Sequence, residues 1–369
     1  MLGGDLKQLR KANVRRVIHA LTTSSTPLSM TALHEKTNLS RPTITSNLQY
    51  IDAQGFLITT QDKASVKGGR PPRSFKFNYD NGIIAGIILG FDEITVGIAN
   101  LAGKLIGSRS CSVNPSDRRH DIALTILRQL VNINAIEWNE LLCVTVSIIG
   151  EVTPEGRTLH KDWFPELGSN DFFNDFKKEF PCPVLFQNDA NLAAIAEYHR
   201  LDEENIPQVM LCLNISQAFG AGIIINGRLF SGAHQAAGEM GHDPALGWSK
   251  CFDTFQQKRA EYGYTLRGVF EDAKIGNKDA KNIVNSFIHE GLPGVRALIC
   301  AFDPDLLVVS GEVCRLDNLA ATILAKDLVS FLHTKPQIIT SNAQGLSVFL
   351  GAIHSSAEYV KDQCYGIVR

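Results

Sequence analysis

The stretch Val184-Leu185-Phe186-Gln187-Asn188-Asp189-Ala190-Asn191 is an apolar run that ends in a cluster of polar residues. The run predicts a strand, and the residues from there to Tyr198 predict a helix. A carboxylate at a strand end, beside the start of a helix, suits base catalysis or the binding of ligand hydroxyl groups. On spacing alone, Asn188 and Asp189 are equally well explained as a helix cap.

The same alternation of strands and helices extends in both directions along the chain. Helices are expected near Ile122–Val131, Asn282–Ala301 and Ser347–Val360. Strands are expected at Ile83–Leu89, Ile94–Asn100, Lys104–Ser112, Leu142–Ile149, Val209–Ile215, Gly222–Ile225, Leu306–Ser310 and Gln337–Thr340, with a hairpin turn at Asn226-Gly227. This α/β body of about 290 residues is too large for one ordinary sheet, so we expect two lobes with a cleft between them.

Charge divides the 369 residues into two parts. The whole chain has a net charge of −2, but residues 1–78 carry 12 lysines and arginines against 4 acids, a net charge of +8, and the remainder carries −10. A basic module on an acidic body suggests a partner that is a polyanion. The apolar runs are too short for a membrane helix and the first residues are charged, so we expect no signal peptide and a cytoplasmic protein with reduced cysteines.

The basic part has the pattern of a winged helix-turn-helix domain, assigned to residues 1–78. Apolar residues at spacings of three to five predict a first helix, with Leu6, Leu9, Val14, Val17, Ile18 and Leu21 on its inner face. Ser29 and Ser40 are candidate N-caps of two further helices separated by a short turn. Strands at Phe56–Thr60 and Arg73–Asn78 then flank a tip that contains Arg70.

The third helix of this domain carries side chains that suit the reading of duplex DNA. Arginine pairs with guanine, asparagine with adenine, and threonine contacts the thymine methyl group. Arg70, between glycine and proline, would enter a minor groove. The candidate DNA contacts are Arg41, Thr43, Thr45, Ser46, Asn47, Arg70 and Arg73. The alternative is a helical adaptor with a solvated turn.

A second polar segment lies in the acidic body, at Ala236-Ala237-Gly238-Glu239-Met240-Gly241-His242. Small residues surround a carboxylate and an imidazole there, and Glu261 follows later. Together with a winged helix-turn-helix, a Gly-Arg-Pro-Pro wing and Asn-Asp-Ala-Asn, this segment resembles the ROK family of repressors, open reading frames and sugar kinases. The resemblance covers about residues 8 to 360.

The resemblance implies a two-lobed actin/hexokinase-like (ribonuclease H-like) fold. We assign residues 79–191 with the C-terminal helix 345–369 to the first lobe, and residues 192–344 to the second lobe, with the sugar-binding and dimerisation elements. In the family, positions that match Asp189, Asn188, Glu239, His242 and Glu261 bind sugar hydroxyls, and the first of these is the base in the kinases. Carboxylates and imidazole are suitable partners for a polyol.

Several departures from the kinase pattern indicate that ATP is not a ligand. The family's early Asp-x-Gly-Gly-Thr loop reads Ile88-Leu89-Gly90-Phe91-Asp92 here, and an acid aimed at phosphate repels it. The second glycine-rich loop reads Ser216-Gln217-Ala218-Phe219-Gly220-Ala221-Gly222. A later Gly-Gly reads Gly311-Glu312. We therefore expect no enzyme activity.

Two further departures concern metal and ligand. The family's structural zinc uses the histidine at 242 and three cysteines, but those three positions hold Phe252, Thr254 and Arg259, so no zinc is expected. Without zinc, the loop at 243–258 would depend on packing. Trp163 appears where family sugar sites often have an asparagine.

These observations lead to an expected function. The chain is expected to be a sugar-responsive transcriptional regulator, a repressor of carbohydrate-metabolism genes, that binds palindromic operator DNA as a dimer or tetramer and is released by a sugar or sugar derivative. The alternatives are an ATP-dependent sugar kinase with an added DNA-binding domain, and a regulator that answers to a protein partner instead of a sugar.

Overall fold

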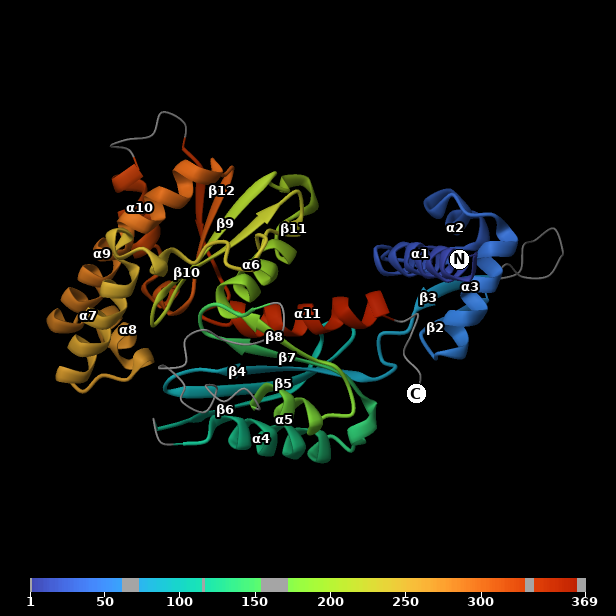
Figure 1. The fold of residues 1–369 in the computed structure, drawn as a ribbon, viewed down its shortest axis with the longest axis horizontal. Helices are drawn as coiled ribbons and strands as arrows, with labels where there is room; N and C mark the ends of the chain where they lie inside the picture. The colour runs from blue at the N-terminus through green and yellow to red at the C-terminus, as the bar shows by residue number, and fades with distance from the viewer. Residues whose placement is uncertain (1, 62–72, 115–116, 154–171, 329–334, 364–369) are drawn as a thin grey trace.

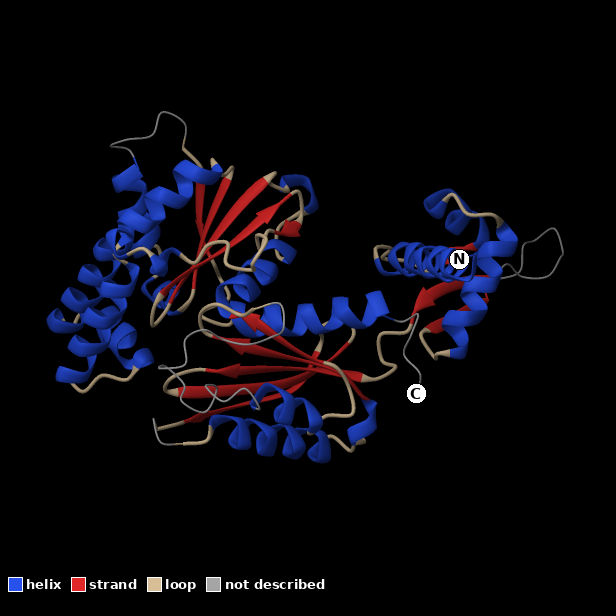
Figure 2. Cartoon of the chain, in the orientation of Figure 1, coloured by secondary structure: helices blue, strands red, loops and turns tan. Residues whose placement is uncertain are grey.

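The computed structural model describes residues 2–61, 73–114, 117–153, 172–328 and 335–363. They form a small N-terminal domain and two α/β lobes (Figures 1 and 2). Arg70 and Trp163, to which the sequence analysis gives expected roles, lie outside the described residues.

The N-terminal domain consists of three helices and a three-stranded sheet. Its helices are α1 (Leu2–Thr22), α2 (Met30–Thr37) and α3 (Arg41–Ala53), and its strands β1 (Leu28–Ser29), β2 (Leu57–Gln61) and β3 (Arg73–Phe77) pair in the order β1-β3-β2. The two expected caps are confirmed, because the Ser29 and Ser40 hydroxyls accept from the backbone N–H groups of Ala32 and Thr43. A short turn therefore separates α2 from α3, as expected.

Two expectations for this domain were wrong. Leu9 is 59% exposed, although Val14, Val17, Ile18 and Leu21 form the inner face of α1 as predicted. Asn47 is only 3% exposed, because it lies on the same face of α3 as Ile44 and Leu48. The side chain of Asn47 is therefore turned into the domain and cannot reach DNA.

The first lobe is a five-stranded mixed sheet with helices on both faces. Its strands are β4 (Ile83–Leu89), β5 (Glu93–Asn100), β6 (Leu105–Ser112), β7 (Leu141–Ile148) and β8 (Val184–Asn188), in the order β6-β5-β4-β7-β8. Helices α4 (Arg119–Ile133) and α5 (Phe172–Lys178) lie on one face, and α11 (Ser347–Gln363) lies on the other (Figure 1). Neighbouring β7 and β8 run parallel, so both end at the same edge.

The second lobe repeats this plan. Strands β9 (Val209–Ile215), β10 (Phe219–Ile225), β11 (Arg228–Leu229), β12 (Leu306–Ser310) and β13 (Gln337–Thr340) pair in the order β11-β10-β9-β12-β13. Its helices are α7 (Trp248–Glu261), α8 (Leu266–Ile275), α9 (Lys278–Phe302) and α10 (Leu319–Leu328). Positive φ angles at Asn226 and Gly227 confirm the expected hairpin turn. The expectation of a loop at 243–258 was wrong, because most of this segment is the helix α7. Trp248, Cys251 and Phe255 of α7 are buried in the core of the lobe.

Two crossing helices connect the three parts. Helix α6 (Asp189–His199) starts where β8 ends and lies between the second sheet and α11, as Figure 1 shows. The two helices approach closely, because a Cβ atom on Gly351 would stand 1.9 Å from the carbonyl oxygen of Leu192. The other end of α11 meets the N-terminal domain, where Arg15 of α1 pairs with Asp362 at 3.5 Å.

Candidate functional site

The site starts at the junction of β8 and α6. The Asn188 side-chain oxygen accepts from the backbone N–H of Asn191 and caps α6. The same side chain donates to the carbonyl oxygen of Gly150 at 2.9 Å and to Glu239 Oε1 at 3.0 Å. Asn188 is thus both a helix cap and the link between β7, β8 and the Glu239 segment.

Asp189, the first residue of α6, faces the second lobe. Its Oδ2 accepts a hydrogen bond from Asn214 Nδ2 at 3.1 Å. Burial raises the pKa of Asp189 to about 6, and hydrogen bonds from backbone N–H groups at the helix start and from Asn214 oppose that rise. The carboxylate is therefore costly to keep charged in the free protein.

Glu239 and His242 come from the segment that precedes α7. Gly238, at φ +91°, allows this segment to approach β10, because a side chain there would meet the carbonyl oxygen of Ala221 at 2.4 Å. The pKa of Glu239 is raised to about 7, first by burial and then by the charges of Asp189 and Glu151. The His242 side chain is more exposed than that of Glu239 and lies at the rim of this site.

A third carboxylate, Glu151, was missed by the sequence analysis. It follows Gly150 after the end of β7 and is only 6% exposed. Its Oε2 lies 3.4 Å from Nε2 of His242. The rule that singled out Asp189, an acid just after a buried strand, applies equally to Glu151, since parallel β7 and β8 end at the same edge.

Glu261 does not join this group. It is the last residue of α7, its side chain is exposed, and its Oε1 accepts from Gln257 Nε2 at 2.8 Å. The structure thus brings together Asn188, Asp189, Glu239 and His242 of the five expected sugar contacts.

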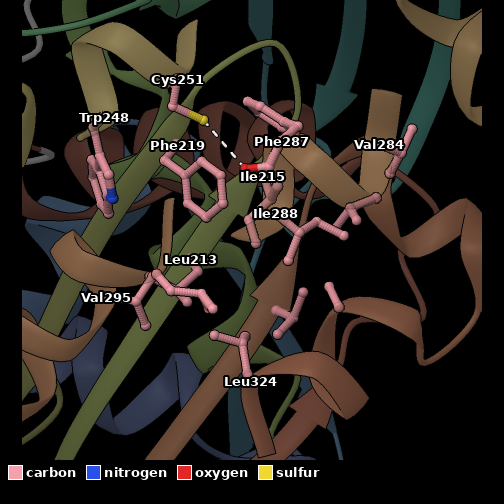
Figure 3. Packing of buried hydrophobic residues seen from close by; sticks show 14 of the residues in the cluster. Leu213, Ile215, Phe219, Trp248, Cys251, Val284, Phe287, Ile288, Val295 and Leu324 are labelled. Carbon is pink, nitrogen blue, oxygen red and sulfur yellow. Dashed lines mark hydrogen bonds between the residues drawn. The ribbon is translucent and has the colours of Figure 1, made fainter. Parts of the chain in front are cut away.

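These four residues line a pocket between the lobes. The other lining residues are Ile149, Gly150, Ala218, Phe219, Gly220, Gly241, Trp248, Ser249 and Phe252. The aromatic lining continues into the core of the second lobe, where Phe219 packs against Trp248 and Phe287 (Figure 3). The pocket therefore combines carboxylates with an apolar wall, a surface that suits a ring with hydroxyl groups on its edge and C–H groups on its faces.

The loop that resembles the kinase phosphate loop is joined to the opposite lobe. Arg259 Nη1 of α7 donates to Asp92 Oδ2 at 2.5 Å, and the backbone N–H of Leu266 at the start of α8 donates to the same oxygen at 2.8 Å. Arg267 pairs with Glu93 at 3.0 Å. We call these two ion pairs the interlobe bridge; beside it, Phe91 contacts Phe252 with ring centroids 5.9 Å apart.

The candidate DNA contacts on the N-terminal domain, other than Asn47, have accessible side chains where the structure describes them. Arg41, Thr45, Ser46 and Arg73 are exposed, and Thr43 is half-buried beside the cap Ser40. Arg41 donates to Thr31 Oγ1 at 3.4 Å, which places its guanidinium beside the first turn of α2. These residues leave the first two turns of α3 open on one face.

The fold and the pocket define a two-lobed α/β protein with a carboxylate-lined cleft and an added N-terminal domain. The ROK family model matches residues 84–354, so the chain belongs to the ROK family. The xylose repressor of Staphylococcus xylosus is 25% identical over 333 residues, covering 85% of this chain and 84% of that protein. The transcriptional dual regulator NagC of Escherichia coli K12 is 22% identical over 342 residues, covering 85% and 83%.

Solved structures share the fold. A ROK family transcriptional regulator, a homologue of the Escherichia coli MLC protein, has a TM-score of 0.71 at 16% identity and covers 97% of this chain and 100% of its own. A Streptomyces griseus glucokinase in complex with glucose and AMPPNP has a TM-score of 0.60 at 18% identity and covers 75% of this chain and all of its own. Among the described residues, no helix is both long and apolar enough to cross a membrane.

Proposed function

We propose that this chain is a sugar-responsive transcriptional regulator that represses carbohydrate-metabolism genes and works in the cytoplasm. The observation that carries the proposal is that α11 joins the two candidate sites. Its N-terminal half packs against α6, which begins at Asp189, and its C-terminal end pairs with α1 through Asp362 and Arg15. The repressor names of the curated relatives support the same function.

The N-terminal domain is proposed to act as a winged helix-turn-helix on duplex DNA. Helix α3 would enter the major groove with Arg41, Thr43, Thr45 and Ser46, while Arg73 and Arg70 of the wing meet the backbone and minor groove. Palindromic operators would require a homodimer or tetramer. Fluorescence anisotropy with operator fragments selected from random DNA tests this, and binding that does not weaken steeply with salt would contradict it.

The pocket is proposed to bind the effector through Asn188, Asp189, Glu239 and His242. A ligand that prefers the closed cleft would shift α6 relative to α11 and change the spacing of two recognition helices in a dimer. The decisive experiment adds sugars to the protein–operator complex. Release of DNA by a sugar, abolished in Asp189→Asn, is the expected result, and the absence of release by every sugar would favour the rival regulator that answers to a protein partner.

Kinase activity is not proposed. Asp92 and Glu93 occupy the turn that would hold phosphates, and their partners Arg259 and Arg267 tie that turn to the other lobe. Ala218 stands at a glycine position of the second phosphate loop, and its neighbour Phe219 is buried in aromatic packing. An ATP-dependent phosphorylation assay over a sugar panel is expected to give no turnover; robust turnover lost in Asp189→Asn would establish the kinase alternative.

No zinc is proposed either, because the residues do not fit a tetrahedral thiolate site. The Cys251 thiol lies in the core and donates to the carbonyl oxygen of Phe287 (Figure 3). Arg259, which stands at one of the family's three cysteine positions, is a cation already paired with Asp92. Metal analysis of the purified protein tests this, and stoichiometric zinc would contradict it.

A further inference from the structure

The hydrogen-bonding groups around the pocket are mostly acceptors. Asp189 and Glu239 line it with carboxylates, and Glu151 adds a third behind His242. Each carboxylate only accepts when it is charged. Oε2 of Glu151 is buried and makes no hydrogen bond within the described part of the chain, although it faces His242 Nε2.

Donors are few by comparison. Both N–H groups of the Asn188 amide are already used, one on the Gly150 carbonyl and one on Glu239. Asn214 donates to Asp189 from behind. Of the described lining side chains, His242, Ser249 and the Trp248 indole have donors, and the indole N–H is committed to the Gly291 carbonyl.

Positive charge is also scarce. The described lining contains no lysine or arginine. Lys250 follows Ser249 in the chain but is exposed and outside the lining, and Arg259, further along α7, is bound to Asp92. Among the described lining residues, His242 is the one side chain that can take up a positive charge, and it lies near Asp189, Glu239 and, outside the lining, Glu151.

We propose that the pocket selects a sugar that carries a free ammonium group, an amino sugar, over neutral and phosphorylated sugars. This inference rests on the proposed function, since it names the class of effector for the same pocket. An ammonium offers three donors and no acceptor, which complements carboxylates that lack donors. A phosphate would meet like charges with no cation to hold it.

Two features of the site agree with this class of ligand. Burial raises the pKa values of both Asp189 and Glu239, the described lining holds no lysine or arginine beside them, and a bound ammonium would supply that countercharge. The apolar wall of Phe219, Trp248 and Phe252 would receive the C–H face of the ring while the charged edge meets the acids.

The test is calorimetric titration of the full chain at about pH 7 with glucosamine, glucose, N-acetylglucosamine and glucosamine 6-phosphate. Glucosamine is expected to bind at least about tenfold more tightly than the other three, a ratio that equals about 1.4 kcal/mol. Glucose or N-acetylglucosamine binding equally or better, and still releasing DNA, would overturn this inference and leave the proposed function standing. If no sugar binds at all, the proposed function fails and this inference fails with it.

A charge variant sharpens the test. Glu151→Gln keeps the shape of the side chain but removes the third carboxylate, so glucosamine affinity is expected to fall about tenfold while glucose affinity stays within about twofold. Asp253→Asn on the exposed side of α7 is the matched control and should change neither. An equal loss for both sugars, or no loss for either, would contradict a charge-selective role. The comparison of ligands on the unmodified chain stands even if the variant fails to fold.

Discussion

Arg259 of the second lobe and Asp92 of the first lie 167 positions apart in the chain and meet at 2.5 Å. Each stands where the ROK resemblance expects something else: Asp92 in the phosphate loop, and Arg259 at a zinc-ligand position. The two departures meet in one ion pair, because the arginine at the expected ligand position pairs with the acid in the expected phosphate loop. The interlobe bridge thus joins the two lobes, and the backbone N–H of Leu266 adds a hydrogen bond to Asp92.

The energy of the Asp92–Arg259 pair is accessible through a double-mutant cycle. Asp92→Asn, Arg259→Gln and the double variant are expected to show a coupling free energy of about 1–2 kcal/mol in urea unfolding, because the arginine is well buried and the acid also accepts from the start of α8. The exposed pair Arg128–Glu179, which lies within the first lobe, is the control and should couple more weakly. Equal coupling free energies in the two pairs would show that the interlobe bridge stabilises the fold no more than an exposed ion pair does.

The crossing of α6 and α11 depends on Gly351. In Gly351→Ala the added Cβ would meet the backbone of Leu192, which cannot rotate away, so the helices must separate. We expect a loss of at least about 2 kcal/mol in the free energy of unfolding, together with weaker coupling between sugar and DNA binding. Gly241→Ala is the control for the unfolding measurement only, since nothing lies within 4 Å of its added Cβ but Gly241 lines the pocket. A neutral Gly351→Ala in thermal unfolding would contradict the close packing.

The buried acids predict how stability depends on pH. Asp189 and Glu239 have folded pKa values of about 6 and about 7, above their ordinary values of 3.8 and 4.5. Between those limits the folded state binds more protons than the unfolded state, so the free energy of unfolding falls as pH rises from about 4 to about 7. Denaturant unfolding across this range measures it.

Replacing one of these acids should flatten that slope. Since one pKa unit corresponds to about 1.4 kcal/mol, Asp189→Asn is expected to gain more than about 1 kcal/mol of stability above pH 7 and little at about pH 4. Asp305→Asn is the control, because the Asp305 carboxylate is remote from Asp189 and Glu239. It accepts from the backbone N–H groups of Gln208 and Val209 at the far end of β9. The Asp305→Asn variant should keep the fall of the free energy of unfolding between pH 5 and 7, a range set by the folded pKa values of Asp189 and Glu239. A slope unchanged in Asp189→Asn would show that its carboxyl is not the source.

Helix α3, the proposed recognition helix, supplies two variants with opposite expected results. Arg41→Ala is expected to weaken operator binding and to reduce the salt slope by about 1 if the guanidinium contacts a phosphate, or to relax base preference if it contacts guanine. Asn47→Ala removes a buried amide whose Nδ2 makes no hydrogen bond among the described residues, so operator affinity should hold in anisotropy titrations. Loss of affinity in Asn47→Ala without loss of folding would restore the expectation that the structure overturned.

Local signals predicted most of the elements. The strands at Ile83–Leu89, Val209–Ile215, Leu306–Ser310 and Gln337–Thr340 have the expected bounds, because short apolar runs bounded by turn residues carry a strong signal. Helix α7 was missed, since its polar residues between Trp248, Cys251 and Phe255 concealed the helical spacing of the buried face. Which side chains of a helix face the core was less predictable than the helix itself, as exposed Leu9 and buried Asn47 show.

By itself, the sequence determined the order of the elements, the basic N-terminal domain, and the polar motifs around Asp189 and Glu239, because each is written in residues that are near one another in the chain. Tertiary structure alone decided which distant groups meet. It brought Glu151 to His242 and Arg259 to Asp92, and it left Glu261 exposed. Such pairings depend on how two sheets and the crossing of α6 with α11 place strand ends in space, and no local pattern encodes that geometry.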